Sequence, residues 1–292
     1  MKLVLLAIAG LWAAQSLAQP KLSTPEETTC WDSFTVQRTV ANLFPTNDVS
    51  FANVRDGDTV DSPFVVDFSI RGMGVVPAGK KLANTGHHHV LIDTPLPLDP
   101  SAEIPFSETH KHFGKGQTNA VLKLSPGPHT LRLLFADEKH RPHYVFTREI
   151  RIQVRGERGS LLAPQIVMDR FDASCKAWYE YVRTSPRPAG ERVVFLNVRD
   201  GETLRSPFRL KFGVDGRFVA AKAAKVPNTG SLLLEVGDAD GGKGRRVDLS
   251  NGQTETDLEL PPGNHKLKLR YLDSLSGEDA LPARTIEVVV KR

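Results

Sequence analysis

Histidine is the residue type in this chain whose number and spacing could do chemistry. Two His-x-His pairs stand out, His87 with His89 and His110 with His112. In a β-strand the side chains at i and i+2 point the same way, so each pair presents two imidazoles on one face. Imidazole is a good ligand for Zn(II) and Cu(II). The spacing therefore predicts a transition-metal site with these four histidines as its primary ligands.

Five further residues are candidates for a secondary role. His88 points to the face opposite His87 and His89, so we expect it to be buried and hydrogen-bonded. His140 and His143 lie on a loop that could add an imidazole, and Asp93 or Glu108 could supply a fourth zinc ligand. The near-absence of methionine argues against a thioether Cu(I) site. A histidine-rich surface that only titrates near neutral pH, or that binds an anionic or sugar ligand, is the alternative.

The elements that position these residues belong to an internal repeat. Segment 51–64 recurs at 195–208, an offset of 144 residues, and Gly-Gln-Thr at 116–118 recurs at 252–254, an offset of 136. Ser-Leu-Leu replaces the three consecutive histidines in the second copy. The fold therefore does not need those histidines. His129 is different because His265 matches it in the second copy, which favours a packing or hydrogen-bonding role.

Short alternating segments fill each copy, for example 65–70, 130–135 and 149–154. Period-two alternation with turn dipeptides such as Asp-Gly and Pro-Gly between the segments is typical of strands with one buried face. Segment 166–183 is the exception and has a helical period. We predict an all-β chain with two tandem immunoglobulin-like β-sandwich modules.

The N-terminus has the pattern of a secretory signal, with Lys2, an apolar run and small residues before a cleavage point after Ala18. The run is shorter than the roughly 20 residues of a membrane span, and we expect no span in the mature chain. The protein is therefore expected to be periplasmic or secreted. The predicted parts are a signal peptide at 1–18, an N-terminal flank at 19–48, a His-rich domain at 49–155, a linker at 156–192 and a diverged second domain at 193–292.

Two cysteines accompany the repeat, Cys30 in the N-terminal flank and Cys175 in the linker. Each precedes one copy and lies beside aromatic residues. Equivalent positions of two copies related by pseudo-symmetry can meet on the axis between them. We therefore predict a Cys30–Cys175 disulfide in an oxidising compartment. Two buried free thiols are the alternative.

The formal net charge of +4 is modest, and acidic residues are interspersed with the basic ones throughout the chain. A nucleic-acid-binding surface needs a sustained cationic stripe, which the sequence lacks. Nucleic acid is therefore not expected as a partner.

The runs Asn-Thr-Gly-His-His-His at 84–89, His-Lys-His-Phe-Gly-Lys-Gly-Gln-Thr at 110–118 and Pro-Gly-Pro-His at 126–129 together resemble a periplasmic family, the domain of unknown function 4399. The resemblance covers about residues 60–154, and a diverged second copy lies at about 195–292. It implies export, a compact β domain and a shared His-rich motif. The second copy departs from the histidine motifs except for Gly-Gln-Thr.

These patterns favour an exported, non-enzymatic protein that binds a copper or zinc ion as a carrier, buffer or sensor. One alternative is an envelope adaptor or adhesive module that binds glycan or a partner protein, as tandem immunoglobulin-like domains often do. Another is a zinc hydrolase that uses an open metal position, although the sequence identifies no general base.

Overall fold

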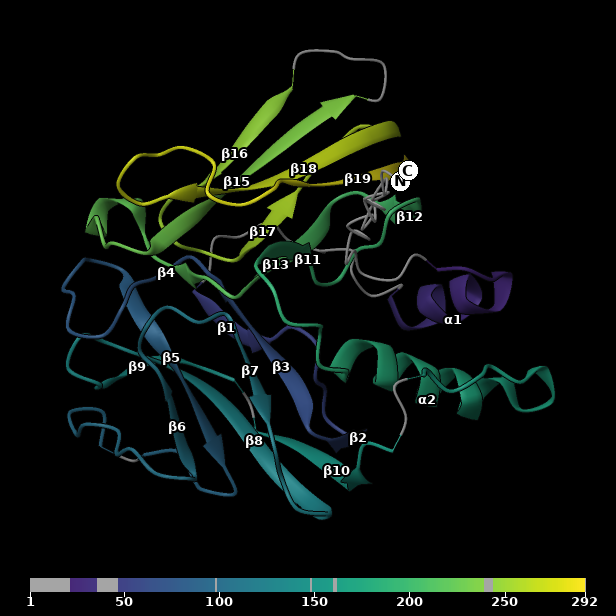
Figure 1. Cartoon of the computed structure of the whole chain (residues 1–292), viewed down its shortest axis with the longest axis horizontal. Helices are drawn as coiled ribbons and strands as arrows, with labels where there is room; N and C mark the ends of the chain where they lie inside the picture. Colours follow the sequence, from purple (N-terminus) through teal and green to yellow (C-terminus); the bar gives the residue numbers. More distant parts are fainter. Residues whose placement is uncertain are drawn as a thin grey trace, which may run out of the picture.

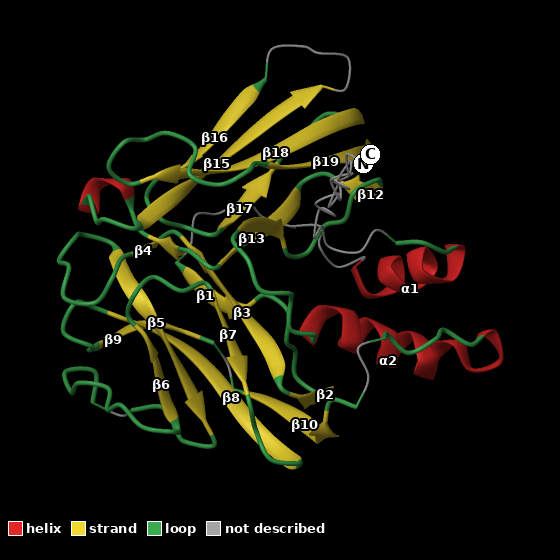
Figure 2. Cartoon of the chain, in the orientation of Figure 1, coloured by secondary structure: helices red, strands yellow, loops and turns green. Residues whose placement is uncertain are grey.

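The computed structural model describes residues 22–35, 47–97, 99–147, 149–159, 162–238 and 244–291, so the predicted signal peptide at 1–18 lies outside the described residues. Within the described part, strands form two β-sandwiches, one above the other in Figure 1, and the helices α1 (Pro25–Thr35) and α2 (Phe171–Thr184) lie to one side. The predominance of strands is plain in Figure 2. The predicted all-β class with two sandwich modules is confirmed. None of the described helices is long and apolar enough to cross a membrane.

The first domain consists of strands β1 to β10. Their bounds are β1 Asp48–Phe51, β2 Asp58–Ser62, β3 Phe64–Arg71, β4 Gly74–Val75, β5 Thr85–Ile92, β6 His110–Phe113, β7 Asn119–Leu122, β8 Gly127–Ala136, β9 Pro142–Phe146 and β10 Ile150–Glu157. One sheet has the order β1-β3-β7. The facing sheet has the order β2-β10-β8-β5-β4, with β6 paired to β5 and β9 paired to β8. Strand β5 therefore lies between β8 and β6.

The second domain repeats this order with strands β11 to β19. Their bounds are β11 Arg192–Phe195, β12 Glu202–Arg205, β13 Phe208–Asp215, β14 Phe218–Val219, β15 Thr229–Asp238, β16 Arg245–Leu249, β17 Glu255–Leu258, β18 Gly263–Asp273 and β19 Arg284–Lys291. The sheets have the orders β11-β13-β17 and β12-β19-β18-β15-β14, with β16 paired to β15. Two 3-10 helices complete the described elements, η2 Met168–Arg170 and η3 Lys222–Ala224.

The core of each sandwich consists of the apolar residues that alternate with polar ones along the strands. In β10, Ile152 and Val154 are buried while the residues on either side of them are exposed or half-buried. They pack in the core with Leu131, Leu133 and Phe135 of the neighbouring strand β8. Burial of each such side chain contributes about 1.5–3 kcal/mol of transfer free energy, which the conformational entropy of folding largely offsets.

The two domains contact each other through equivalent hydrogen bonds in both directions. The amide of Val75 donates to the carbonyl of Gly252 at 3.0 Å, and the amide of Val219 donates to the carbonyl of Gly116 at 2.7 Å. Val219 is the repeat equivalent of Val75, and Gly252 is that of Gly116. The Gly-Gln-Thr motif shared by the copies therefore belongs to the interface between domains, in addition to leading into strand β7 from Asn119.

The threonines of the same motif reinforce this exchange. The amide of Ile70 donates to Oγ1 of Thr254 at 3.1 Å, and the amide of Val214 donates to Oγ1 of Thr118 at 3.0 Å. All four residues are buried. A buried amide left without a partner would cost about 1–3 kcal/mol, so the retention of threonine in both copies has a structural reason.

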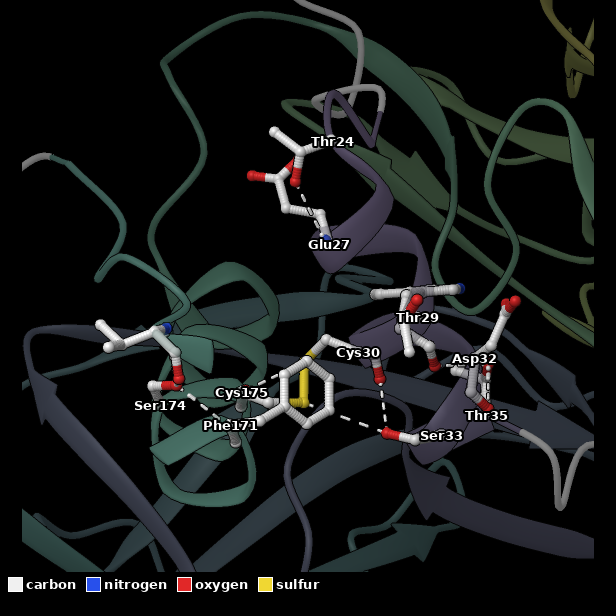
Figure 3. The surroundings of a disulfide bond; sticks show 12 residues. Thr24, Glu27, Thr29, Cys30, Asp32, Ser33, Thr35, Phe171, Ser174 and Cys175 are labelled. Carbon is white, nitrogen blue, oxygen red and sulfur yellow. Dashed lines mark hydrogen bonds between the residues drawn. A yellow bond between two sulfur atoms is a disulfide. The ribbon is translucent and has the colours of Figure 1, made fainter. Parts of the chain in front are cut away.

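Helices α1 and α2 are joined by a disulfide between Cys30 and Cys175 (Figure 3). Trp31 and Tyr179 pack around it, with ring centroids 5.4 Å apart. Helix α2 corresponds to the segment predicted to be helical from the sequence, whereas the sequence pattern does not predict α1. The guanidinium of Arg183 in α2 bonds to the carboxylate of Asp58 in β2, which fixes this helix to the first domain.

Candidate metal site

Strand β5 presents its three histidines to opposite faces of the sheet. The rings of His87 and His89 lie on one face, with their Nε2 atoms 3.0 Å apart. His88 points the other way into the core, where its ring packs against Phe68 and Phe135. Because side chains alternate along a strand, the sequence alone determines this division.

His88 is fully buried as expected, but the hydrogen bond predicted for it is absent. Neither ring nitrogen has a hydrogen-bond partner among the residues that the structure describes. Both of its ring neighbours are phenylalanines, which offer no donor or acceptor. His88 therefore carries an uncompensated desolvation cost that the leucine at the equivalent position of the second domain avoids.

Two other segments bring a further imidazole each to the pair on β5. Strand β6 pairs with β5 so that His112 lies opposite His89, and their ring centroids are 5.0 Å apart. The turn that follows β8 carries His140, whose Nδ1 lies 3.0 Å from Nε2 of His87. One donor nitrogen from each of the four histidines lies within 4.8 Å of all the others.

His110 is not a member of this four-histidine cluster, although the sequence places it among the primary ligands. It is opposite Leu91, two residues before His112 in β6, and its Nδ1 lies 3.1 Å from the hydroxyl oxygens of both Ser107 and Thr109. His140 occupies the fourth position instead. His143 also lies apart from the cluster, with its Nε2 3.2 Å from the carbonyl of Thr85.

The carboxylates suggested as zinc ligands have other partners. Asp93 pairs with Nδ1 of His129 at 2.7 Å and accepts the amide of Thr130. Glu108 is almost fully exposed and forms an ion pair with Lys111. Neither belongs to the group of donors that could share an ion, which contains only imidazoles.

His129 has the structural role that its repetition in the second copy predicts. Its Nε2 lies 2.9 Å from the carbonyl of Ser125, and Nε2 of His265 lies 2.8 Å from the carbonyl of Pro261 at the equivalent turn. In both copies the ring therefore closes the turn that precedes a long central strand.

Burial keeps the imidazoles of His87, His89 and His112 neutral. Desolvation, together with the charges that His112 and His140 would carry, lowers the pKa of His87 to about 3. Desolvation and then the neighbouring His87 lower the pKa of His89 to about 2. Burial also lowers the pKa of His112, and the charge that His140 would carry is the second cause. The neutral imidazole is the form that binds a metal ion, so at neutral pH these three ligands release no protons on binding.

Phe106 and Gly114 shape the space around the cluster. The ring of Phe106 lies 4.6 Å from His112 and 4.9 Å from His140 between centroids, yet its side chain is 60% exposed. It covers part of the solvent side of the site. A Cβ on Gly114 would lie 2.2 Å from Cε1 and Nε2 of His112, so only glycine leaves room for that ring. The sequence pattern assigns neither residue a role at the metal site, although Gly114 follows His-x-His-Phe directly.

The arrangement suits a four-coordinate transition-metal ion. Zinc–nitrogen bonds of 2.0–2.1 Å in a tetrahedron place the nitrogens about 3.3 Å apart. The two closest pairs in the cluster, each 3.0 Å apart, are near this separation. Nε2 of His112 is buried without a hydrogen-bond partner among the described residues. That nitrogen is available to an ion.

Among its described residues, the second domain holds no equivalent of this cluster. Ser231 and Leu233 occupy the positions of His87 and His89, and Glu235, the next residue on that face, forms ion pairs with Lys268 and Arg270. The described residues of that domain include one histidine, His265, which closes a turn. The potential ligands therefore lie in the first domain.

The solved structures that match this chain share little sequence with it. The fibronectin(III)-like modules of Clostridium thermocellum CbhA are 9% identical over 83% of this chain and 94% of theirs, with a TM-score of 0.22. A two-domain fibronectin type-III segment of chicken tenascin is 11% identical over 84% and 97%, with a TM-score of 0.22. The endo-beta-1,4-mannanase of Thermotoga petrophila is 15% identical over 54% of this chain and 29% of its own, with a TM-score of 0.25. At these scores the likenesses carry no argument about function.

No curated protein matches the chain. A family model does match, twice, and the matches cover residues 66–155 and 210–291, which lie in the first and second domains. This agrees with the resemblance drawn from the histidine motifs and with the diverged second copy. The chain belongs to the family described as domain of unknown function (DUF4399), with two copies of the domain in tandem.

Proposed function

We propose that this protein binds one transition-metal ion, Cu(II) or Zn(II), through His87, His89, His112 and His140, and acts as a carrier, buffer or sensor of that ion. The observation that carries the proposal is the convergence of four imidazoles from three separate segments, with donor atoms within 4.8 Å of one another. No structural role explains why these four polar rings gather in a domain whose repeat does without them.

The donor set favours binding over catalysis. Catalytic zinc sites have three protein ligands and keep a fourth position for water, whereas four protein donors fill a tetrahedral site. Glu108 and Asp93, the carboxylates suggested above as zinc ligands, are engaged with Lys111 and His129 instead. A general base must be within reach of the water that it activates. A hydrolase is therefore the weaker hypothesis.

The cellular location is part of the proposal. The leader-like N-terminus predicts export, and the disulfide between Cys30 and Cys175 is of a kind that persists in the periplasm or outside the cell. Both features support a role in handling metal ions outside the cytoplasm.

Single substitutions at the half-buried histidines test the proposal with matched controls. Protein lacking residues 1–18 and stripped with chelator would be titrated with Cu(II) and Zn(II) by calorimetry, with elemental analysis of the product. We expect one tight equivalent, weakened in His112→Ala and His140→Ala. His110→Ala and His143→Ala remove histidines outside the cluster and should bind as the natural protein does.

A further variant tests the geometry rather than the number of histidines. Gly114→Ala keeps every imidazole but places a methyl group where the His112 ring lies, and it should weaken binding with little loss of stability. If the natural protein binds neither ion at micromolar concentration, the metal proposal is wrong. Pull-downs with envelope glycan and envelope proteins would then test the adaptor hypothesis.

A further inference from the structure

His140 differs from the other clustered histidines because no strand holds it. It lies in the turn that follows β8, and its φ of 62° is in the left-handed region that non-glycine residues rarely adopt. Such a conformation costs a non-glycine residue about 1–2 kcal/mol. Other contacts must therefore hold the turn in place.

The side chain of Asp137 provides two of these contacts. Its Oδ1 accepts the amide of Lys139 at 2.8 Å and the amide of Arg141 at 2.9 Å, and these are the residues on either side of His140. The backbone closes the same turn, because the amide of His140 donates to the carbonyl of Asp137 at 3.0 Å. One carboxylate oxygen thus fixes the backbone before and after the ligand.

The turn is also anchored to the loop that covers the site. The amide of Ile104 donates to the carbonyl of His140 at 2.8 Å, and the Ile104 side chain is buried beside Leu91 and Leu134. This contact limits movement of the turn away from the sheet. The direction of the His140 ring still depends on the local backbone that Asp137 shapes.

The second domain contains a similar turn without a ligand. At the end of β18, Oδ1 of Asp273 accepts the amides of Leu275 and Ser276, both at 2.9 Å. Ser276 is the repeat equivalent of His140. The aspartate-capped turn is therefore a feature of the fold, and the first domain places a histidine on it.

We propose that Asp137 is the positioning residue for the metal ligand His140, and that it acts through the two hydrogen bonds from its Oδ1 to the turn. This inference rests on the proposed metal-binding function. Asp137 itself is not a ligand, since it is absent from the group of donors that could share an ion.

The test compares three aspartate variants of the full mature chain. Asp137→Ala removes the acceptor, Asp137→Asn keeps an oxygen that accepts the same two amides, and Asp273→Ala makes the matching change in the second domain. Loss of a residue that orients a metal ligand typically lowers affinity about 10- to 100-fold. We expect that loss for Asp137→Ala, near-natural affinity for Asp137→Asn, and no change for Asp273→Ala.

Co(II) supplies a readout that a loss of stability would not change. Its visible absorption is stronger in a four-coordinate tetrahedral site than in a five- or six-coordinate one. The Co(II) spectrum of Asp137→Ala should match that of His140→Ala, and Asp137→Asn should restore the natural spectrum. The inference would be overturned if Asp137→Ala kept the natural affinity and spectrum, or if Asp137→Asn bound the metal as weakly as Asp137→Ala. Either result would leave the metal site itself intact. Failure of the natural protein to bind Cu(II), Zn(II) or Co(II) would instead refute the proposed function.

Discussion

Replacing Gly252 by alanine should weaken the contact between the two domains. Gly252 has a φ of +91°, and a Cβ there would lie 2.7 Å from the carbonyl oxygen of Val75 and 2.9 Å from the amide nitrogen of Ala221. These backbone atoms are themselves hydrogen-bonded, since the amide of Val75 donates to Gly252 and the amide of Ala221 donates to Val75. Backbone atoms cannot rotate away from a new methyl group, so the domains must separate locally.

The structure gives the size of the effect and a control for it. A left-handed backbone costs a residue other than glycine about 1–2 kcal/mol, and a methyl group forced into a packed contact costs about 1–3 kcal/mol more. Gly252→Ala should therefore lower the free energy of unfolding by about 2–5 kcal/mol. Gly201 has a φ of +82° and nothing within 4 Å of its missing Cβ. Gly201→Ala should therefore lower the free energy of unfolding only by the backbone term of about 1–2 kcal/mol.

Urea unfolding of the metal-free protein measures both losses, and hydrogen exchange locates them. Gly252→Ala should also speed exchange of the amide hydrogens of Val75 and Ala221, whereas Gly201→Ala should leave them protected. Equal losses of stability in the two variants, with unchanged exchange at Val75, would refute the close approach of the domains at this point.

Three further predictions concern the core, the disulfide and a titrating turn. His88→Leu should raise the free energy of unfolding of the metal-free protein by about 1–3 kcal/mol, because it removes two buried ring nitrogens without partners; a lower urea midpoint would contradict this. Replacing both Cys30 and Cys175 by serine removes a disulfide that spans 145 residues of sequence. The chain-entropy model then gives a decrease in the free energy of unfolding of up to about 5 kcal/mol. An unchanged urea midpoint would show that the packing of the helices does not depend on the disulfide. Burial opposes protonation of His129, but the hydrogen bond and charge of Asp93 and the bond to Ser125 outweigh it and raise the pKa of His129. Protonated His129 therefore stabilises the fold fully below its unfolded pKa near 6.5, and this stabilisation is lost as the pH rises through its folded pKa. Asp93→Asn should lower the free energy of unfolding more at pH 6 than at pH 8.5. The difference between the two pH values should be less than about 1 kcal/mol. An NMR titration in which Asp93→Asn leaves the pKa of His129 unchanged would exclude this pairing.

The fold was largely predictable because its signals are local. Period-two alternation, turn dipeptides and the internal repeat predict strands and two sandwiches, and the structure has both. Helix α1 was not predictable in the same way. Its packing depends on the disulfide and on Tyr179 of the distant helix α2, which are contacts between residues far apart in sequence.

The candidate site was likewise predictable only in part from local signals. That His87 and His89 share a face follows from strand geometry, and the role of His129 follows from its repetition in the second copy. The choice of His140 over His110 does not follow from spacing. It depends on the register of β6 against β5, which places His110 opposite Leu91 and outside the cluster. It also depends on the direction in which the chain turns after β8.

Four features follow from the sequence alone, because each depends on periodicity or on comparison within the chain: the repeat, the strand character, the pairing of His87 with His89 and the confinement of the His-x-His motifs to one copy. Only the folded structure shows which imidazoles meet and why Gly-Gln-Thr occurs in both copies. Those features depend on close approaches between segments that are distant in sequence. Such approaches are fixed by strand register and domain packing, which no local pattern encodes.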